Sequence, residues 1–406
     1  MLRHGCLKLI SGVLLIIGGN AAAQGLFPVG GENKSKGMES ALAARRGSAV
    51  LYNPANLALA PDGQHPYVEI GYANVNYAYE HPKFDPVIVR SNTPTVTLGY
   101  STRLSKRWHL GAVFAPERYG QTKIPGVPQQ IGDETYSVAV TDDHRVFNSG
   151  LGLAYKVHRR FQVGLSILHT YEREKSTASL VGNEGTNLLE QDVHAQYFRP
   201  RVGGHLTRKN FRVVGTYMPK QEIFYSGRTV TAFNLDDTVP RQRRFEPAVV
   251  GTGVGLKWDS YTAQMDVNYK QWSQGRDVYR SALAFDETHA DLNDVLERGV
   301  SFSYRHDPRH KLTLGASYLP TPWGPGHDDG TPAGHVEGMT FGDFSGITRR
   351  SVAAGTSVVM GKQHDRAIDF AVYHSRGVRE VRTTFDNAGF YQVDMTVIST
   401  TVTANF

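Results

Sequence analysis

From His65 onward, apolar and polar residues alternate along segments of roughly ten residues, which is the spacing of membrane-spanning β-strands. The alternation is clearest in residues 245–258 and 261–270. In the first segment Val250, Leu256 and Trp258 share one face, and three glycines occupy the other. In the second, Asp266 and Lys270 lie on the polar face. A soluble two-layer sandwich would alternate in the same way, so this pattern alone predicts only β structure.

The alternation predicts fourteen strands, an even number as in bacterial single-chain barrels. We place them at residues 66–80, 93–104, 107–118, 145–157, 160–174, 193–207, 210–225, 244–258, 260–273, 297–306, 309–320, 348–361, 366–380 and 389–406. Short connections (104–107, 158–159, 207–210, 259–260, 306–309 and 361–365) alternate with long ones (81–92, 119–144, 175–192, 226–243, 274–296, 321–347 and 381–388). Short turns on one side and long loops on the other favour an outer-membrane barrel over a soluble sandwich.

Aromatic residues flank the short connections, where the headgroup girdle of a barrel lies. They are Tyr100, Trp108, Phe161, Phe211, Trp258, Tyr261 and Tyr304. The chain ends on Phe406, and a terminal aromatic suits outer-membrane assembly. In the last strand the alternation slips where Val397 and Ile398 are adjacent, which indicates either a β-bulge or a shifted register.

Composition supports β structure and export. Glycine (42), tyrosine (20) and phenylalanine (18) are abundant, and no apolar run long enough for a helical span follows residue 24. Residues 1–23 have the form of a secretory leader, with Arg3 and Lys8 before an apolar core and three alanines before Gln24. The single cysteine, Cys6, lies inside this leader, so the mature chain is expected to form no disulfide.

The formal charge changes the picture only slightly. Loss of Arg3 and Lys8 with the leader lowers the net charge from +6 to +4, a mildly basic balance that suits anionic lipopolysaccharide or anionic ligands. Arg241, Arg243 and Arg244 form a basic cluster without interleaved aromatics. We therefore interpret them as lipopolysaccharide contacts and expect no nucleic-acid binding.

Residues 47–58 differ from the rest of the chain because they carry no strand alternation. They follow a glycine-rich, charged segment and contain a turn at Asn53 and Pro54, since proline fixes its own φ and restricts the residue before it. Small residues here, Ala49, Ala55 and Ala58, allow close packing against a surrounding wall. The segment predicts either a plug inside the barrel or an ordinary loop after the leader.

Side chains suited to catalysis or metal binding form no convincing site. Asp142, Asp143 and His144, like residues 327–329, lie in predicted long loops without partners at ligand spacing. No nucleophile elbow, phosphate-binding loop or zinc-protease motif is present. His169, His374 and Ser375 could serve a rim-located hydrolase, as in barrel lipases, but we expect no enzyme, no metal and no cofactor.

With fourteen strands and a candidate plug, the chain resembles the FadL/TodX family of outer-membrane transporters for long-chain fatty acids and hydrocarbons. The residues that carry the resemblance are 25–28, 47–55, 108–116, 245–248 with 269–272, and 313–322. The resemblance covers nearly the whole mature chain. It implies an all-β, fourteen-stranded antiparallel barrel (65–406) with a small N-terminal hatch (24–64) in its lumen.

The resemblance also implies a ligand path. Its hatch residues would be Phe27, Tyr52, Asn53, Pro54 and Ala55. The lateral-opening strand would contain Gly111, Phe114 and Pro116, because the family is thought to release substrate sideways at a kink in the third strand. Two positions depart from the family: Asn56 replaces a usual glycine, and Glu117 with Arg118 replaces a Phe-Gly pair, which affects the expected ligand path.

These features predict outer-membrane transport of a hydrophobic small molecule by a monomer surrounded by lipid and lipopolysaccharide. Two other functions fit the sequence. A general diffusion porin would need no N-terminal plug, and an adhesin or phage receptor would act through its long loops.

Overall fold

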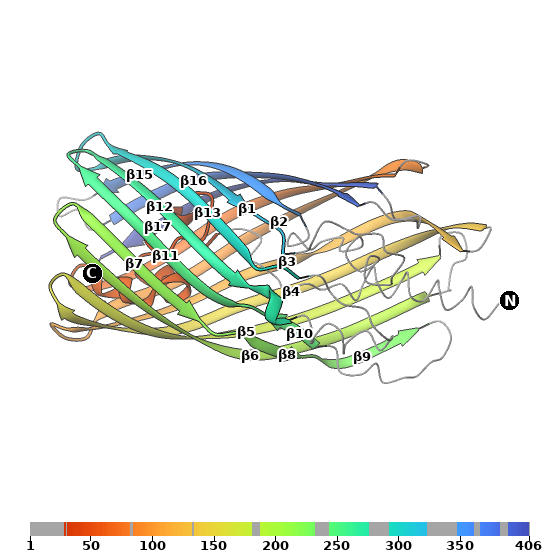
Figure 1. The fold of residues 1–406 in the computed structure, drawn as a ribbon, viewed down its shortest axis with the longest axis horizontal. Helices are drawn as coiled ribbons and strands as arrows, with labels where there is room; N and C mark the ends of the chain where they lie inside the picture. Colours follow the sequence, from red (N-terminus) through yellow and green to blue (C-terminus); the bar gives the residue numbers. More distant parts are fainter. Residues whose placement is uncertain are drawn as a thin grey trace.

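The computed structural model describes residues 28, 29, 31–81, 84–131, 134–180, 187–231, 243–275, 292–322, 347–360, 366–381 and 389–405. These residues form a closed antiparallel β-barrel (Figure 1). The ladder runs from β5 through β1 to β17, and then back through β11 and β7 to β6. Because β6 also pairs with β5, the wall has no free edge, and the predicted fold class is confirmed.

The wall has fourteen strands, two of which are interrupted. The strand segments are β1 Gln64–His81, β2 Phe84–Arg103, β3 Trp108–Ile131, β4 Glu134–His158, β5 Phe161–Leu180, β6 Asn187–Arg208, β7 Phe211–Met218, β8 Gln221–Phe224, β9 Ser226–Thr231, β10 Arg243–Glu246, β11 Ala248–Trp258, β12 Tyr261–Gln271, β13 Val295–Arg305, β14 His310–Leu319, β15 Arg349–Met360, β16 Arg366–Val381 and β17 Gly389–Ala404. Pro219 separates β7 from β8, and Pro247 separates β10 from β11, since proline cannot donate to the ladder.

The predicted connections are partly correct. All six short connections lie between the expected strands. Three predicted long loops are wrong, because 81–92, 119–144 and 175–192 consist mostly of strand in the hairpins β1–β2, β3–β4 and β5–β6. These extensions stand beyond the band where one face must be apolar, so their sequences lack the alternation used to find strands.

Alternation sorts the side chains between the two faces of the wall as predicted. In β11, Val250 and Leu256 are exposed on the outer face, whereas Gly251 and Gly253 are buried inside. In the neighbouring β12, Asp266 is buried on the inner face. Large apolar side chains are exposed on the outside of nearly every wall strand, an apolar surface far larger than soluble monomers carry.

The aromatic residues predicted beside the short turns are mostly on this outer face. Trp108, Phe161, Phe211, Trp258, Tyr261 and Tyr304 are exposed. Tyr261 is central to one group, with its ring 5.1 Å from that of Tyr304. Tyr100 differs from the others because it is only half-exposed. An outward aromatic ring therefore surrounds the end of the barrel that carries the short turns.

The last strand contains no bulge. Val397 pairs with Ala73 and Ile398 with Tyr72 in an uninterrupted ladder, so the predicted slip is wrong. Val397 is fully buried inside the barrel and Ile398 is exposed outside. Two adjacent apolar residues fit a regular strand here because both of its faces accept apolar side chains at this height. Phe406 lies outside the described residues.

The helical elements are all short. They are α2 Gly31–Lys34, η1 Arg46–Ser48, α3 Ala49–Tyr52 and η2 Pro54–Leu59 in residues 28–63, which we call the N-terminal segment, and η3 Trp272–Gly275. Among the described residues, no helix has the length and apolar character needed to cross a bilayer.

Candidate functional site

The N-terminal segment lies inside the barrel, toward the end with the short turns (Figure 1). Most of its residues from Gly31 to Ala58 are buried. It follows the inner wall: α2 contacts β15, β16 and β17, η1 contacts β1, β2 and β3, and η2 contacts β3 to β6. A chain that precedes the barrel in sequence therefore fills part of the lumen.

Wall glycines receive this segment at close approach. Gly355 faces Ser35, Gly315 faces Lys36, Gly299 faces Met38, Gly253 and Gly255 face Leu42, Gly111 and Gly152 face Leu57, Gly150 faces Val50, Gly164 faces Pro54 and Ala55, and Gly203 faces Asn53. A Cβ at Gly164 would lie 2.4 Å from the backbone nitrogen of Ala55, which no side chain allows. By contrast, Gly204 and Gly215 lie on the outer face of the wall, where a Cβ would meet nothing within 4 Å. The glycines of the inner face thus include a set that makes room for the segment.

The turn at Asn53, Pro54 and Ala55 is held by hydrogen bonds as well as by this fit. The Asn53 Oδ1 accepts a hydrogen bond from the Ala55 backbone N–H at 3.2 Å, which caps η2. The Asn53 Nδ2 donates to the Ala41 carbonyl at 3.2 Å and to the wall carbonyl of Gly204 at 3.4 Å. Pro54 occupies the first position of η2, where a missing N–H costs nothing.

Asn56, the residue that departs from the family, has a structural role of its own. Its Nδ2 donates to the carbonyls of Ala41 and Ala44, both at 2.8 Å. Its Oδ1 lies 2.6 Å from Nδ1 of His205 on β6. Both residues are buried, so the pair ties two turns of the segment to the wall in a place that a glycine would leave open.

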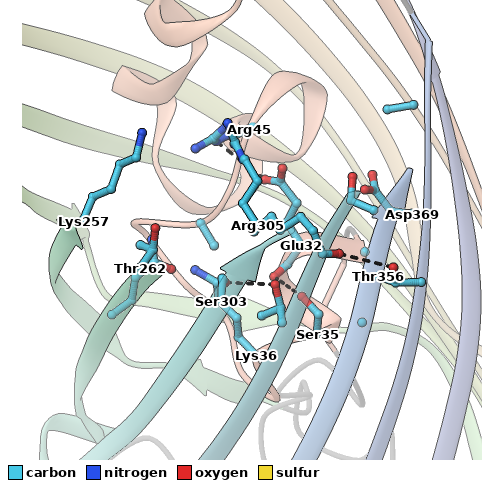
Figure 2. Close-up of a pocket in the computed structure, with 18 of the residues that line it drawn as sticks. Glu32, Ser35, Lys36, Arg45, Lys257, Thr262, Ser303, Arg305, Thr356 and Asp369 are labelled. Atoms are coloured by element: carbon cyan, nitrogen blue, oxygen red, sulfur yellow. Dashed lines mark hydrogen bonds and ion pairs between the residues drawn. The ribbon is translucent and has the colours of Figure 1, made fainter. Parts of the chain in front are cut away.

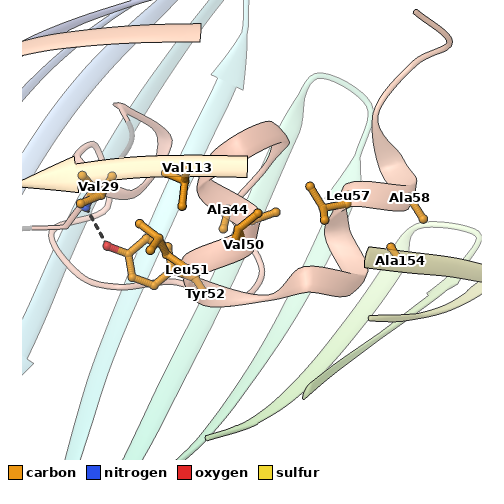
Figure 3. Close-up of a cluster of buried hydrophobic side chains, with 11 residues drawn as sticks. Val29, Ala44, Val50, Leu51, Tyr52, Leu57, Ala58, Val113 and Ala154 are labelled. Carbon is orange, nitrogen blue, oxygen red and sulfur yellow. Dashed lines mark hydrogen bonds between the residues drawn. The ribbon is translucent and has the colours of Figure 1, made fainter. Parts of the chain in front are cut away.

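Apolar side chains complete the contact between segment and wall (Figure 3). Val50 and Leu57 pack with Val113 of β3 and Ala154 of β4, and Leu57 lies against Gly111. The Tyr52 hydroxyl accepts a hydrogen bond from the Val29 N–H at 2.8 Å, which closes the segment on itself. Phe27 lies outside the described residues.

Two cavities flank the N-terminal segment. The larger, of about 450 Å³, lies toward the short turns and is lined mainly by charged and polar side chains (Figure 2). The smaller, of about 120 Å³, lies on the other side of the segment between it and strands β4 to β6, β11 and β12. We call them the lower and the upper cavity.

The upper cavity combines apolar walls with unpaired hydrogen-bond donors. Its apolar lining comprises Val29, Leu51, Tyr52, Leu168, Tyr197, Met218, Pro247, Val249 and Trp272. Three buried N–H groups of lining residues have no hydrogen-bond partner among the described residues: Arg199 Nε, Arg201 Nε and Trp272 Nε1. Buried donors are normally satisfied, so these three indicate where a ligand or water would bind.

The charges around the upper cavity are unequally compensated. Arg199 pairs with Glu246 at 3.2 Å, and Lys270 pairs with Glu297 at 2.7 Å. Arg201 has no carboxylate partner in the part of the chain described, and it donates instead to the Tyr52 carbonyl at 3.1 Å. Arg201 is thus the one lining cation without an ion pair among the described residues, although the Glu39 carboxylate also lines the cavity.

The strand expected to open sideways lies at a discontinuity in the wall. Strands β2 and β3 pair only from Arg103–His109 to Leu98–Phe114, although both continue far beyond this point. Phe114 is thus the last β3 residue in that ladder. Pro116 follows at a register shift between β3 and β4, where the residue pairing skips Glu117. The described ladder leaves β2 and β3 unpaired above Phe114.

The side chains considered for catalysis or metal binding are separated. Asp142, Asp143 and His144 belong to strand β4 rather than to a loop, and His144 pairs with Glu172 at 2.7 Å. Ser375 is buried inside the barrel and bonded to Ser351, whereas the His374 Nδ1 lies 3.1 Å from Thr396 Oγ1 on the other face of the wall. Within the described residues no group of three His, Cys, Asp or Glu could hold a metal.

The remaining candidates are distributed as follows. His169 lies on β5, remote from β16 in the strand order, and its ring packs in a tilted arrangement against that of Phe198, with the centroids 4.8 Å apart. Arg243 and Arg244 begin β10. Arg241 and residues 327–329 lie outside the described part of the chain. Sequence reasoning missed Arg199, Arg201 and Trp272, although arginines two residues apart in an alternating strand share one face, which was the available signal.

Comparisons with known proteins agree on the fold. No family model matches the sequence, and no curated protein matches it. Among solved structures, a FadL homologue from Pseudomonas aeruginosa is similar at 12% identity with a TM-score of 0.68, over 94% of this chain and 99% of that one. The Ralstonia pickettii toluene transporter TbuX matches at 15% identity and a TM-score of 0.61, over 94% and 99%. The P. putida toluene transporter TodX matches at 15% and 0.60, over 89% and 94%.

At these identities the likeness concerns the fold. The chain has the architecture of FadL-type and hydrocarbon channels, and the expected family resemblance is confirmed at this level.

Proposed function

We propose that this chain is an outer-membrane transporter of hydrophobic small molecules that carry an acceptor group at one end, with long-chain fatty acids as the best-fitting class. The observation that carries the proposal is the upper cavity, where apolar side chains surround Arg201 and three unpaired donors. A carboxylate would satisfy these donors, and an alkyl chain would pack on Leu51 and Leu168. Among the compared structures, the two described as toluene transporters support the apolar part of the ligand.

In this proposal the first 23 residues are an export leader, residues 24–64 form the hatch, and residues 65–406 form the barrel. The outward apolar side chains face lipid, and the aromatic ring beside the short turns lies at the periplasmic headgroups. Lipopolysaccharide contacts the outer rim, and the protein acts as a monomer without a cofactor or nucleic acid.

The size of the upper cavity suggests that the hatch must move. A volume of about 120 Å³ is well below that of ordinary ligand pockets, so it accommodates only the polar end and the first carbons of a long chain. A longer ligand requires displacement of Leu51 and Tyr52. Release would then follow the seam above Phe114, where β2 and β3 are unpaired, because an apolar molecule is more stable in lipid than in water.

The buried N-terminal segment argues against the alternative of a general diffusion porin. Its contacts extend around the wall from β17 to β6, and it separates the two cavities. No feature of the described residues favours an adhesin over a transporter.

The substitution Arg201→Met tests the proposal. It removes the free cation and its unpaired Nε, so we expect the affinity for palmitate to fall by about tenfold or more, since a charge-assisted hydrogen bond contributes ~1.5–3 kcal/mol. Affinity for hexadecanol should change much less. The measurement is ligand binding to detergent-purified protein, followed by uptake of radiolabelled palmitate into cells.

Arg208→Met is the matched control, because Arg208 lies on the same strand, β6, but is exposed at the short-turn end. Equal losses for palmitate and hexadecanol would show that the variant disturbs the hatch rather than the binding of the polar end. Unchanged palmitate affinity would exclude Arg201 as the recognition group and, with it, the fatty-acid assignment.

A further inference from the structure

The lower cavity carries an excess of positive charge that the proposed transport of apolar ligands does not explain. Nine lysine and arginine side chains line it, against three carboxylates. It lies inside the wall between the N-terminal segment and the short turns (Figure 2). Its volume of about 450 Å³ is within the range of small-molecule sites.

Of the three lining carboxylates, Glu32 and Asp369 have partners, and Asp259 makes no ion pair among the described residues. Glu32 lies 3.8 Å from Arg45, and Asp369 receives a hydrogen bond from Ser357. Asp266, which lies behind the cavity, accepts a hydrogen bond from the Leu42 N–H at 3.3 Å. The acidic groups therefore do not neutralise the remaining cations by direct contact.

Three cations of the cavity, Lys36 of the segment and Arg212 and Lys311 of the wall, make no ion pair among the described residues. Lys36 is only 5% exposed, yet among the described residues its ammonium has no ion pair and no hydrogen bond. Arg212 lies over Gly255, with its guanidinium 3.6 Å from where a Cβ would be, and Lys311 lines the same space. Figure 2 shows Lys36 extending from the segment toward Thr262 of the wall. A buried, uncompensated ammonium is costly, and this cost is relieved when an anion binds beside it.

The electrostatics of the segment agree with an anion site. Burial raises the pKa of Glu32, but Arg45, Lys311, Arg46 and Lys36 together hold it below its ordinary value. Burial lowers the pKa of Lys36 to about 7, although Asp266 opposes the shift. The lowered pKa of the half-buried Glu32 reports a positive local potential, whereas the lowered pKa of Lys36 reports mainly its burial.

We infer that the lower cavity is a binding site for a small polyvalent oxyanion of the phosphate class, held by Lys36, Arg212 and Lys311. Arginine matches phosphate oxygens with two parallel donors, and the two lysines add point charges. More than one negative charge on the ligand is needed because the excess of cations is large. The site goes beyond the proposed transport function and relies on it only for the direction in which the cavity opens, toward the periplasm.

Calorimetric titration of the detergent-purified full chain with inorganic pyrophosphate tests this inference. We expect saturable binding that weakens as salt is added. The double variant Lys36→Met with Arg212→Gln should weaken it by about tenfold or more. Lys311→Gln provides a variant that leaves the N-terminal segment unchanged and should also weaken binding, in case the double variant does not fold.

Two controls make the outcome decisive. Lys106→Gln removes an exposed lysine from a short turn at the same end of the barrel that does not line the cavity, and it should leave the affinity within about twofold. Octanoate, a monovalent carboxylate, should bind the lower cavity more weakly than pyrophosphate. The absence of saturable binding, an equal effect of Lys106→Gln, or equal competition by octanoate would each overturn the assignment. The palmitate affinity of the same variants separates this result from the test of Arg201.

Discussion

The upper and lower cavities lie on opposite sides of one short segment and differ in almost every property. The upper cavity has apolar walls, one cation without an ion pair and a few unpaired donors, whereas the lower has an excess of cations without ion pairs among the described residues. The same segment supplies both surfaces: Leu51 and Tyr52 line the upper cavity, and Lys36 and Arg45 line the lower. A few turns of irregular helix thus separate two chemical environments inside one barrel.

This difference indicates that the N-terminal segment does more than fill the lumen. A segment that only blocked the lumen would need only small residues fitted to the wall glycines. Here the residues on each side are suited to different ligands, so movement of the segment would connect two sites as well as open a path. Four predictions test the separation, beginning with the largest expected effect.

Deletion of residues 31–60 should abolish the separation. Because a fourteen-stranded barrel is too wide for its own side chains to fill, we expect single-channel conductance to rise by at least about tenfold over the intact chain. Planar-bilayer recordings provide the measurement, and retained barrel folding is checked by circular dichroism. Conductance that stays near zero would mean that other parts of the chain close the bore.

Gly164→Ala should weaken the separation without removing the segment. Its Cβ would collide with the backbone at Pro54 and Ala55, and such overpacking costs ~1–3 kcal/mol. We expect frequent brief channel openings in the same recordings. Gly204→Ala is the matched control, because its Cβ would have open space. Its channel openings should be as rare as those of the unaltered protein. Similar leak from both variants would show that the fit to Gly164 does not hold the segment.

Pro116→Thr tests whether ligand leaves from the upper cavity through the wall, without entering the lower cavity. Threonine restores a backbone donor beside the unpaired part of β2, and one added hydrogen bond of ~0.5–1.5 kcal/mol should slow palmitate uptake by about two- to tenfold. Palmitate affinity in detergent should stay unchanged, since Pro116 does not line the cavity. Unaltered uptake would argue against release at this seam.

The smallest effect concerns pH. Burial lowers the pKa of Lys36 to about 7, so the side chain gains its proton as the pH falls from 8 to 6. Sulfate, which does not titrate in this range, should therefore bind the lower cavity a few-fold more tightly at pH 6. The charged groups that act on Lys36 are Asp266, Lys311, Glu32 and Arg212.

Lys36→Met separates this effect from other titrating groups. Glu32 remains ionised over this pH range because its pKa is lowered. The variant should bind sulfate with less dependence on pH. An unchanged pH dependence in Lys36→Met would exclude Lys36 as the titrating group.

Much of the barrel could be predicted from its sequence because a lipid-facing strand must alternate. In β11 and β12 the predicted faces are the observed ones, since a shift by one residue would turn Val250 and Leu256 inward. The predicted strands of the hairpin β3–β4 were too short. Beyond the apolar band, nothing in residues 119–144 demands alternation of apolar and polar side chains. The turn at Asn53 and Pro54 was found because proline restricts its own backbone and that of its neighbour.

The recognition residues were harder to find. Arg199 and Arg201 resemble other inward-facing polar residues, and only their packing against Tyr52 and Glu246 distinguishes them. Lys36 likewise lies in a charged stretch whose composition predicts exposure to solvent. Its burial depends on the close approach of its backbone to the wall, which Gly315 permits.

The sequence by itself determined the β architecture, the number of wall strands and the side of the barrel that carries the short turns, because these follow from local periodicity and turn chemistry. Tertiary structure alone decided which glycines meet the N-terminal segment, where β2 and β3 separate, and how the lumen divides into two unlike cavities. Those features depend on contacts between residues far apart in the chain, and no local pattern encodes such contacts.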